Sequence, residues 1–200
     1  MKNEGRMGSL NSFTAGFNVD LKLQENFSLL CELDYITKGS VTKANFAFLG
    51  AGFTYEESLK INYLELPLLA KFSFPVTKGK IYLMVGPSFA YALSGRSSLT
   101  TNIDSLFGFS GNTYTLKESI DFKRDNVNRF DCAANFGVGF SFLAGACRIN
   151  PEFRYQIGLI NLNTEKAVDE EEYRVTTTCI VISVGISFPF HSGSNNAHAN

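Results

Sequence analysis

The sequence predicts an all-β fold, an antiparallel up-and-down β-barrel, and two observations support that prediction. Seven segments alternate large apolar residues with small or polar ones, and a period of two residues is typical of a β-strand. The connections between the segments are alternately short and long, as in a series of hairpins. The 200 residues are enough for one barrel domain. The segments cover residues 12–23, 27–38, 61–74, 81–93, 130–142, 147–159 and 176–190.

Each segment, taken in order, has one apolar face and one small or polar face. Short connections join the segments at residues 24–26, 75–80 and 143–146, whereas residues 39–60, 94–129 and 161–173 are long and rich in Gly, Ser, Asn and charge. We therefore expect turns at one end of the barrel and long loops at the other. The apolar faces are exemplified, in chain order, by Phe17, Leu29, Leu66, Leu83, Val138, Phe153 and Ile182.

The last segment shows the alternation most clearly. Ile180 and Ile182 belong to its apolar face, whereas Ser183 and Gly185 belong to the opposite face. Residues 176–190 exceed the usual length of a strand in a soluble sheet, and they suit a strand that crosses a membrane at a tilt. The chain has no apolar run of about 18 residues, the length that a transmembrane helix needs.

The composition of the polar face indicates which face is inside. Gly, Ala and Ser would be poor choices for a solvated surface, but they suit the crowded interior of a barrel of about eight strands. Charges of both signs lie on this face, where they can pair, and a charge on a lipid-facing side would cost roughly 2–4 kcal/mol near the midplane. We expect an interior ion-pair network that contains Asp20, Lys22, Glu32, Asp34, Glu65, Lys71, Asp131, Arg148, Glu152 and Arg154.

Aromatic residues of the apolar faces gather near the ends of the segments. This distribution is typical of the two interfacial girdles of a membrane barrel. Its alternative is a soluble sandwich or ligand-binding barrel, in which the same apolar face would form the core. The predicted girdle residues are Phe27, Tyr35, Phe72, Phe74, Tyr91, Phe140, Phe142, Phe188 and Phe190.

The composition gives few indications of chemistry. The net charge of −1 does not favour a nucleic-acid partner, and four cysteines without a CxxC pair favour neither a disulfide framework nor a metal site. The two histidines, His191 and His198, follow the last segment, so no histidine general base is expected on the barrel wall. Glu32 and Glu65 could form an acid–base pair, but we interpret them as members of the ion-pair network. We expect no cofactor and no catalysis.

Several motifs resemble one known family. Residues 61–72, INYLELPLLAKF, are similar to the "YLEIPLLxKY" strand of the PorT-like outer-membrane β-barrel family of Bacteroidota. Residues 26–39, 85–87, 136–140 and 151–161 resemble further strands of that family in the same order. The resemblance covers nearly all of residues 12–190. It implies an outer-membrane barrel, and for most members of the family no defined biochemical activity.

The number of segments is odd, whereas bacterial outer-membrane barrels usually have an even number of strands. We therefore expect a transmembrane barrel with seven strands present of an expected eight, the first strand and a signal peptide lying upstream of Met1. Residues 1–11 would then be the remnant of an outer loop, residues 12–190 the barrel domain and residues 191–200 a polar tail. Residues 1–6 have no apolar run of the kind that a signal peptide contains.

These observations predict a non-enzymatic protein of the outer membrane that contacts its lipid. The predicted interior is too full for a wide pore, so we expect a structural role or an interaction with a protein partner through loop 94–129. Two alternatives remain at this point: an accessory component of a protein secretion system, and a carrier of a lipid or another hydrophobic ligand.

Overall fold

The computed structural model describes residues 4–48, 51–103, 112–162 and 176–188. Within these ranges no helix is long and apolar enough to cross a membrane. The regular structure is antiparallel β-sheet, and every strand pairs with at least one other. The strands are β1 (Glu4–Ser9), β2 (Thr14–Lys22), β3 (Phe27–Phe48), β4 (Ala51–Val76), β5 (Gly79–Ile103), β6 (Asn112–Ser119), β7 (Phe130–Ala144), β8 (Cys147–Gly158) and β9 (Thr178–Ser187).

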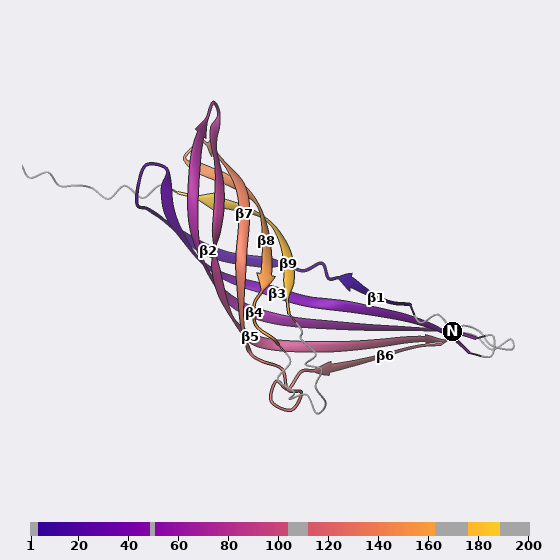
Figure 1. Ribbon diagram of the computed structural model, residues 1–200. Helices are drawn as coiled ribbons and strands as arrows, with labels where there is room; N and C mark the ends of the chain where they lie inside the picture. Colours follow the sequence, from indigo (N-terminus) through magenta and orange to yellow (C-terminus); the bar gives the residue numbers. More distant parts are fainter. Residues whose placement is uncertain (1–3, 49–50, 104–111, 163–175, 189–200) are drawn as a thin grey trace, which may run out of the picture.

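Seven of these strands form a single curled sheet, here called the barrel part (Figure 1). Its order is β2, β3, β4, β5, β7, β8 and β9, and all its neighbours are antiparallel. The prediction of an all-β, antiparallel, up-and-down arrangement of seven strands is confirmed. Each strand curls the sheet further because neighbouring strands are twisted relative to one another.

The barrel part has an open seam. Within the described part of the chain β2 pairs with β3 alone and β9 with β8 alone, so β2 and β9 face each other across a groove without pairing. A groove of about 790 Å³ lies along this gap and is lined from both sides. Side chains beside the gap are the most exposed of the apolar face: Phe17 is 85% exposed and Ile182 76%. The seam therefore leaves two rows of backbone groups unpaired within the sheet.

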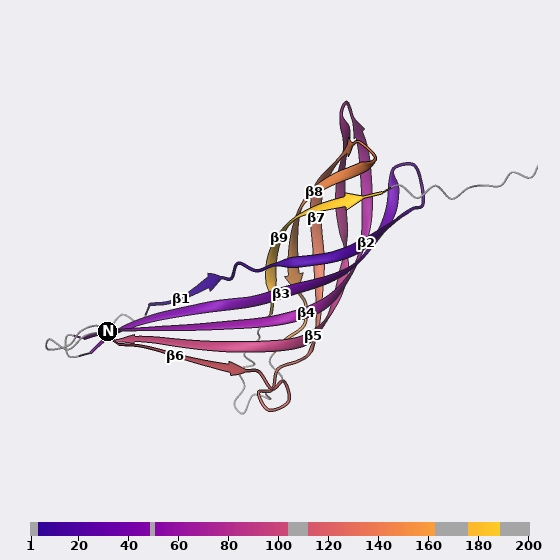
Figure 2. The ribbon, with the colours of Figure 1, turned by 180° about the vertical axis from the view of Figure 1, so that it is seen from behind.

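Three strands of the barrel part are much longer than the other four. Strands β3, β4 and β5 contain 22, 26 and 25 residues. At about 3.3 Å per residue β4 is about 85 Å long, whereas about 9–11 residues suffice to cross a membrane. Their outer ends form a flat projection flanked by β1 and β6, which we call the arm (Figure 2).

The prediction of long loops was wrong for most of residues 39–60 and for half of residues 94–129. Residues 39–48 and 51–60 continue the β3–β4 ladder, and residues 94–103 pair with β4 and β6. The Gly, Ser and Asn residues that suggested loops are tolerated because most of these strands have a neighbour on each side. Much of the predicted loop 161–173 lies outside the described residues, as do Phe190 and the tail 191–200. Residues 4–9 of the predicted outer-loop remnant form β1.

The outer face of the sheet changes from apolar to polar at one level. On β4 the outward residues change from Leu64 to Asn62, and on β5 from Leu93 to Ser94. The register of the β4–β5 ladder shifts at this point, as a β-bulge does at the rim of a barrel. Thr37 Oγ1 donates to Asn62 Oδ1 at 2.7 Å, and Asn62 Nδ2 donates to Ser94 Oγ at 2.9 Å. This polar row marks where the lipid-facing surface ends.

Between the polar row and the short-turn end, the outward face of every strand in the barrel part is apolar. Near the short-turn end, the Phe27 and Phe72 rings are tilted with centroids 4.9 Å apart, and the Phe140 and Phe142 rings stack with centroids 5.8 Å apart. Tyr91 is exposed at the opposite end, next to the polar row. The other predicted girdle residues within the described ranges, Tyr35, Phe74 and Phe188, are likewise exposed.

Replacing Leu68 by Lys should lower the free energy of unfolding by roughly 2–4 kcal/mol, because the ammonium group would lie on the lipid-facing side. Ser58→Lys is the matched control, since Ser58 lies on the same face of β4 but within the arm, and its effect should stay within about 0.5 kcal/mol. Urea unfolding of protein folded into phosphatidylcholine vesicles, followed by gel mobility of unheated samples, measures both. Equal losses would contradict the assigned boundary.

Candidate functional site: the interior network and the barrel mouth

The interior of the barrel part is built by the inward residues of each strand. On β4 the period of two directs Tyr63, Glu65, Leu69 and Lys71 inward, and all four are buried. Polar and charged side chains are therefore enclosed together, which is favourable only where each charge finds a partner. Three groups of contacts provide these partners.

Arg154 on β8 is the centre of the first group. Its guanidinium donates two hydrogen bonds to Glu32 on β3, at 2.6 and 3.0 Å, and a third to Glu152 at 3.2 Å. Tyr82 on β5 also donates to Glu152, at 2.7 Å. Two parallel bonds from a guanidinium to one carboxylate are a strong and direction-specific form of ion pair. This pair spans the interior from β3 to β8, which are not neighbours in the sheet.

Lys38 is the centre of the second group, nearer the mouth. Its ammonium lies 3.0 Å from Glu65 Oε2 and 3.4 Å from Asp131 Oδ2. Gln156 donates to Glu65 Oε1 at 3.0 Å, and Thr177 donates to Asp131 Oδ2 at 2.9 Å. One cation thus joins carboxylates from β4 and β7.

Lys71 forms the third group, nearer the short-turn end. Its ammonium lies 2.8 Å from Asp20 Oδ2 on β2 and 4.2 Å from the centre of the Tyr82 ring. Tyr82 therefore connects this group with the first, because its hydroxyl contacts Glu152 while its ring faces Lys71. The cation–π contact adds an attraction that a saturated side chain could not provide.

The structure brings together most of the predicted network but not all of it. Asp20, Glu32, Glu65, Lys71, Asp131, Glu152 and Arg154 take part in the contacts above. Asp34 and Arg148 are half-buried, and no ion pair joins either to another described residue. Lys22 lies on the inward face of β2, opposite the buried Ser28, but its side chain is exposed and no ion pair joins it to another described residue, because β2 is an edge strand.

Sequence reasoning missed Lys38, Tyr82 and Gln156 as members of the network. The signal for Lys38 was present, because it continues the alternation of Glu32, Asp34 and Ile36 by one more step. No periodicity could have indicated the partner of Gln156, since that depends on the register of β8 against a distant strand.

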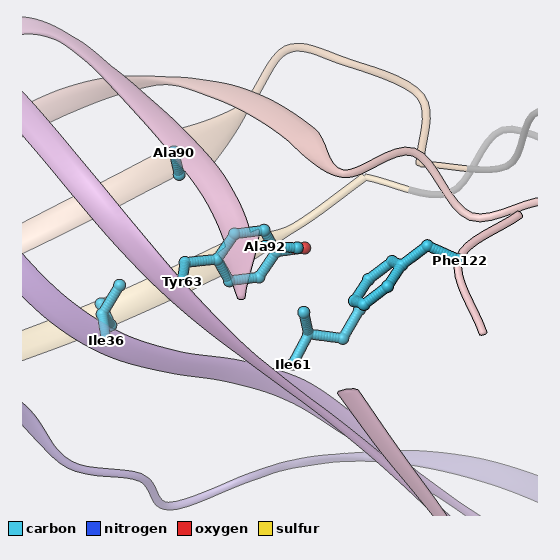
Figure 3. Packing of buried hydrophobic residues seen from close by; sticks show 6 residues of the cluster. All are labelled: Ile36, Ile61, Tyr63, Ala90, Ala92 and Phe122. Carbon is cyan, nitrogen blue, oxygen red and sulfur yellow. The ribbon is translucent and has the colours of Figure 1, made fainter. Parts of the chain in front are cut away.

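A turn from the β6–β7 connection covers the barrel mouth. Phe122 is 5% exposed and packs against Ile61, with Tyr63 and Ala92 further inside (Figure 3). The guanidinium of Arg129 lies 4.5 Å from the centre of the Phe122 ring. Backbone N–H groups of Arg124 and Lys123 donate to the carboxylate of Asp121, and these bonds hold the pKa of Asp121 below its usual range. The turn thus fixes the aromatic side chain over the interior.

The four cysteines are half-buried and free, and their register partners on neighbouring strands are not cysteines. Within the described ranges, no three His, Cys, Asp or Glu side chains are placed to hold a metal ion. Both histidines lie outside those ranges.

A curled antiparallel sheet that is apolar outside and ion-paired inside defines a membrane-embedded β-barrel protein. The chain belongs to the outer membrane protein beta-barrel domain family, whose family model matches residues 1–164. It is therefore an integral barrel protein of the outer membrane. No curated protein and no solved structure matches the chain.

Arg154→Met should lower the free energy of unfolding by about 3–5 kcal/mol, because Glu32 and Glu152 would stay buried without their cation. The double variant Glu32→Gln/Arg154→Met should recover part of this loss, since it removes charges of both signs. Lys43→Met is the control: its pair with Glu56 is largely exposed, so about 0–1 kcal/mol is expected. Urea unfolding in vesicles measures all three. A loss for Arg154→Met no larger than for Lys43→Met would show that the network is not structural.

Proposed function

We propose that this protein is a non-catalytic outer-membrane protein with a closed interior, and that the arm is its working surface. One observation carries the proposal: β3, β4 and β5 pass without interruption from the lipid-facing region into the arm. The membrane part then serves as an anchor, and the arm presents a paired sheet outside the lipid. Function resides in what extends from a rigid scaffold more often than in the scaffold itself.

The side chains of the interior support the absence of a wide pore. The Arg154–Glu32 pair crosses the interior, Lys38 bridges two carboxylates above it, and Phe122 covers the mouth. Small barrels are generally filled by their own side chains. The same charges disfavour a carrier of hydrophobic ligands, because an apolar molecule would have to displace buried, paired ions.

Reconstituted protein should give no resolved single-channel currents in planar bilayers, because the Arg154–Glu32 pair and the Lys38 contacts would obstruct an aqueous path through the interior. The triple variant Lys38→Ala/Tyr63→Ala/Phe122→Ala, which removes the side chains nearest the mouth, should conduct more than the wild type if it folds. Gel mobility of unheated samples establishes folding first. Stable channels of uniform size from the wild type would refute the closed interior.

The free edge of the arm supports an interaction with a protein partner. Among the described strands β6 pairs with β5 alone, so its other edge can accept an extended segment of another chain. Tyr114 and Leu116 lie on one face of β6 and are 62% and 57% exposed. Tyr114 is the register partner of Thr101 on β5, and Leu116 is the register partner of Leu99. The partner expected at residues 94–129 would thus bind a sheet edge and not a loop.

A photoactivatable phenylalanine derivative at position 116 should form adducts with a partner protein in cells, whereas the same group at position 115 should form few. Leu116 and Thr115 are adjacent on β6 but point to opposite faces, which makes the pair a matched comparison. Mass spectrometry identifies the adducts. Secretion-machinery subunits among them would favour the accessory role in secretion. Equal labelling from both positions, or none from 116, would contradict the proposed surface.

A further inference from the structure

A cleft of about 570 Å³ lies beside the barrel mouth, at the level of the polar row on the outer face. Its walls come from β4, β5, the connection between β1 and β2, and the segment around Phe122. Three cations line it, Lys60, Arg96 and Arg129, and none of the described residues that line it is acidic. We propose that this cleft binds a phosphomonoester, and that its position favours the phosphate of an outer-membrane lipid headgroup as the source.

The arrangement of the cations is the first argument. Lys60 and Arg96 are direct partners in the β4–β5 ladder, so their side chains share one face of the sheet. Like charges directly opposite each other destabilise a sheet unless something of opposite charge lies between them. Both side chains are exposed, and among the described residues no carboxylate forms an ion pair with either.

Three nearby acids already have other partners, and Glu118, which pairs with Ser97, lies on the face of the sheet opposite to Arg96. Glu56 lies 2.8 Å from Lys43, and Asp125 lies 3.1 Å from Arg124. Asp121 accepts hydrogen bonds from the backbone of its own turn. The positive charge of the cleft is therefore not neutralised by these groups, and an external anion is the remaining way to neutralise it.

The donors of the cleft suit phosphate. Two guanidinium groups and an ammonium match the charge of a phosphomonoester, which is about −1.5 to −2 at neutral pH. The guanidinium of Arg129 lies over the Phe122 ring, which limits its freedom. Asn62 Nδ2 donates to Ser94 Oγ, so the Ser94 hydroxyl hydrogen remains available for a ligand oxygen. Flat, forked donors bind phosphate oxygens in pairs.

The surroundings of the cleft favour an amphiphilic ligand. Leu93 and Phe13 line the same cleft as the three cations, and both are exposed, with Phe13 at the level of Thr37 in the polar row. A lipid could place its phosphate among the cations while its acyl chains follow the apolar face of the barrel part. This inference rests on the outer-membrane location of the chain and goes beyond the proposed role of the arm.

The test uses the full chain folded into phosphatidylcholine nanodiscs that contain a minor fraction of diphosphoryl lipid A or of the same lipid without its phosphates. Native mass spectrometry measures how much of either lipid is retained. The phosphorylated lipid should be retained selectively. Lys60→Gln/Arg96→Gln should weaken retention roughly 25-fold, since one cation near an anionic surface contributes about fivefold. Lys43→Gln/Arg124→Gln removes two cations on the same side of the membrane but outside the cleft, and should retain the lipid as the wild type does.

The outcomes separate the sources of phosphate and the two proposals. Equal retention of both lipids, or equal retention by wild type and Lys60→Gln/Arg96→Gln, would overturn the site. Displacement by inorganic pyrophosphate at concentrations that match the lipid would assign the site to a soluble phosphorylated ligand, and the lipid source would be refuted. Unheated gel mobility in pure phosphatidylcholine is measured first, because failure there would concern membrane insertion and not phosphate binding.

Discussion

The rest of the structure depends on one constraint: in lipid, every backbone N–H and C=O group must find its partner within the protein. Continuous antiparallel ladders satisfy this constraint for β3, β4, β5, β7 and β8, each of which has two neighbours in the barrel part. The same ladders direct alternate side chains to opposite faces, so one face must be apolar and the other must pair its own charges. The apolar exterior and the Arg154–Glu32 pair are therefore two consequences of one geometry.

The seam is where the constraint is not met by the described strands. Strands β2 and β9 run in the same direction, since five strands separate them in an antiparallel order. Only a strand antiparallel to both could satisfy the two edges at once. The interior charges support the same conclusion, because the interior acids outnumber the interior cations among the described residues, and Glu32, Asp34 and Glu152 line the seam groove beside Lys38 and Arg154. Cationic side chains on the inward face of such a strand would balance this surplus. The interior acids are Asp20, Glu32, Asp34, Glu65, Asp131 and Glu152, and the interior cations are Lys38, Lys71, Arg148 and Arg154.

The sequence allowed the barrel strands to be predicted because the face of a residue depends only on local periodicity. Ile182 and Ser183 could be assigned to opposite faces from their neighbours alone. Partners were not predictable in this way: Arg154 and Glu32 are 122 residues apart, and their contact depends on curvature and register across the whole sheet. The arm was missed for a different reason. Its Ser and Gly residues are typical of loops, and only the long β3–β4 hairpin shows that they are paired. The exposure of Lys22 could not be predicted, because local periodicity does not distinguish an edge strand from a central one.

The arm and the barrel part have a fixed relation because no loop separates them. A hinge needs residues that can change their backbone angles without breaking hydrogen bonds, yet residues 59–62 of β4 are paired with both β3 and β5. The bulge at Asn62 and Tyr63 bends the sheet at the level where lipid ends, and the Thr37–Asn62–Ser94 row fixes that bend with side-chain hydrogen bonds. The orientation of the β6 edge relative to the membrane is therefore set by the same ladder that anchors the protein. A partner that pairs with β6 would be held in one direction relative to the outer surface.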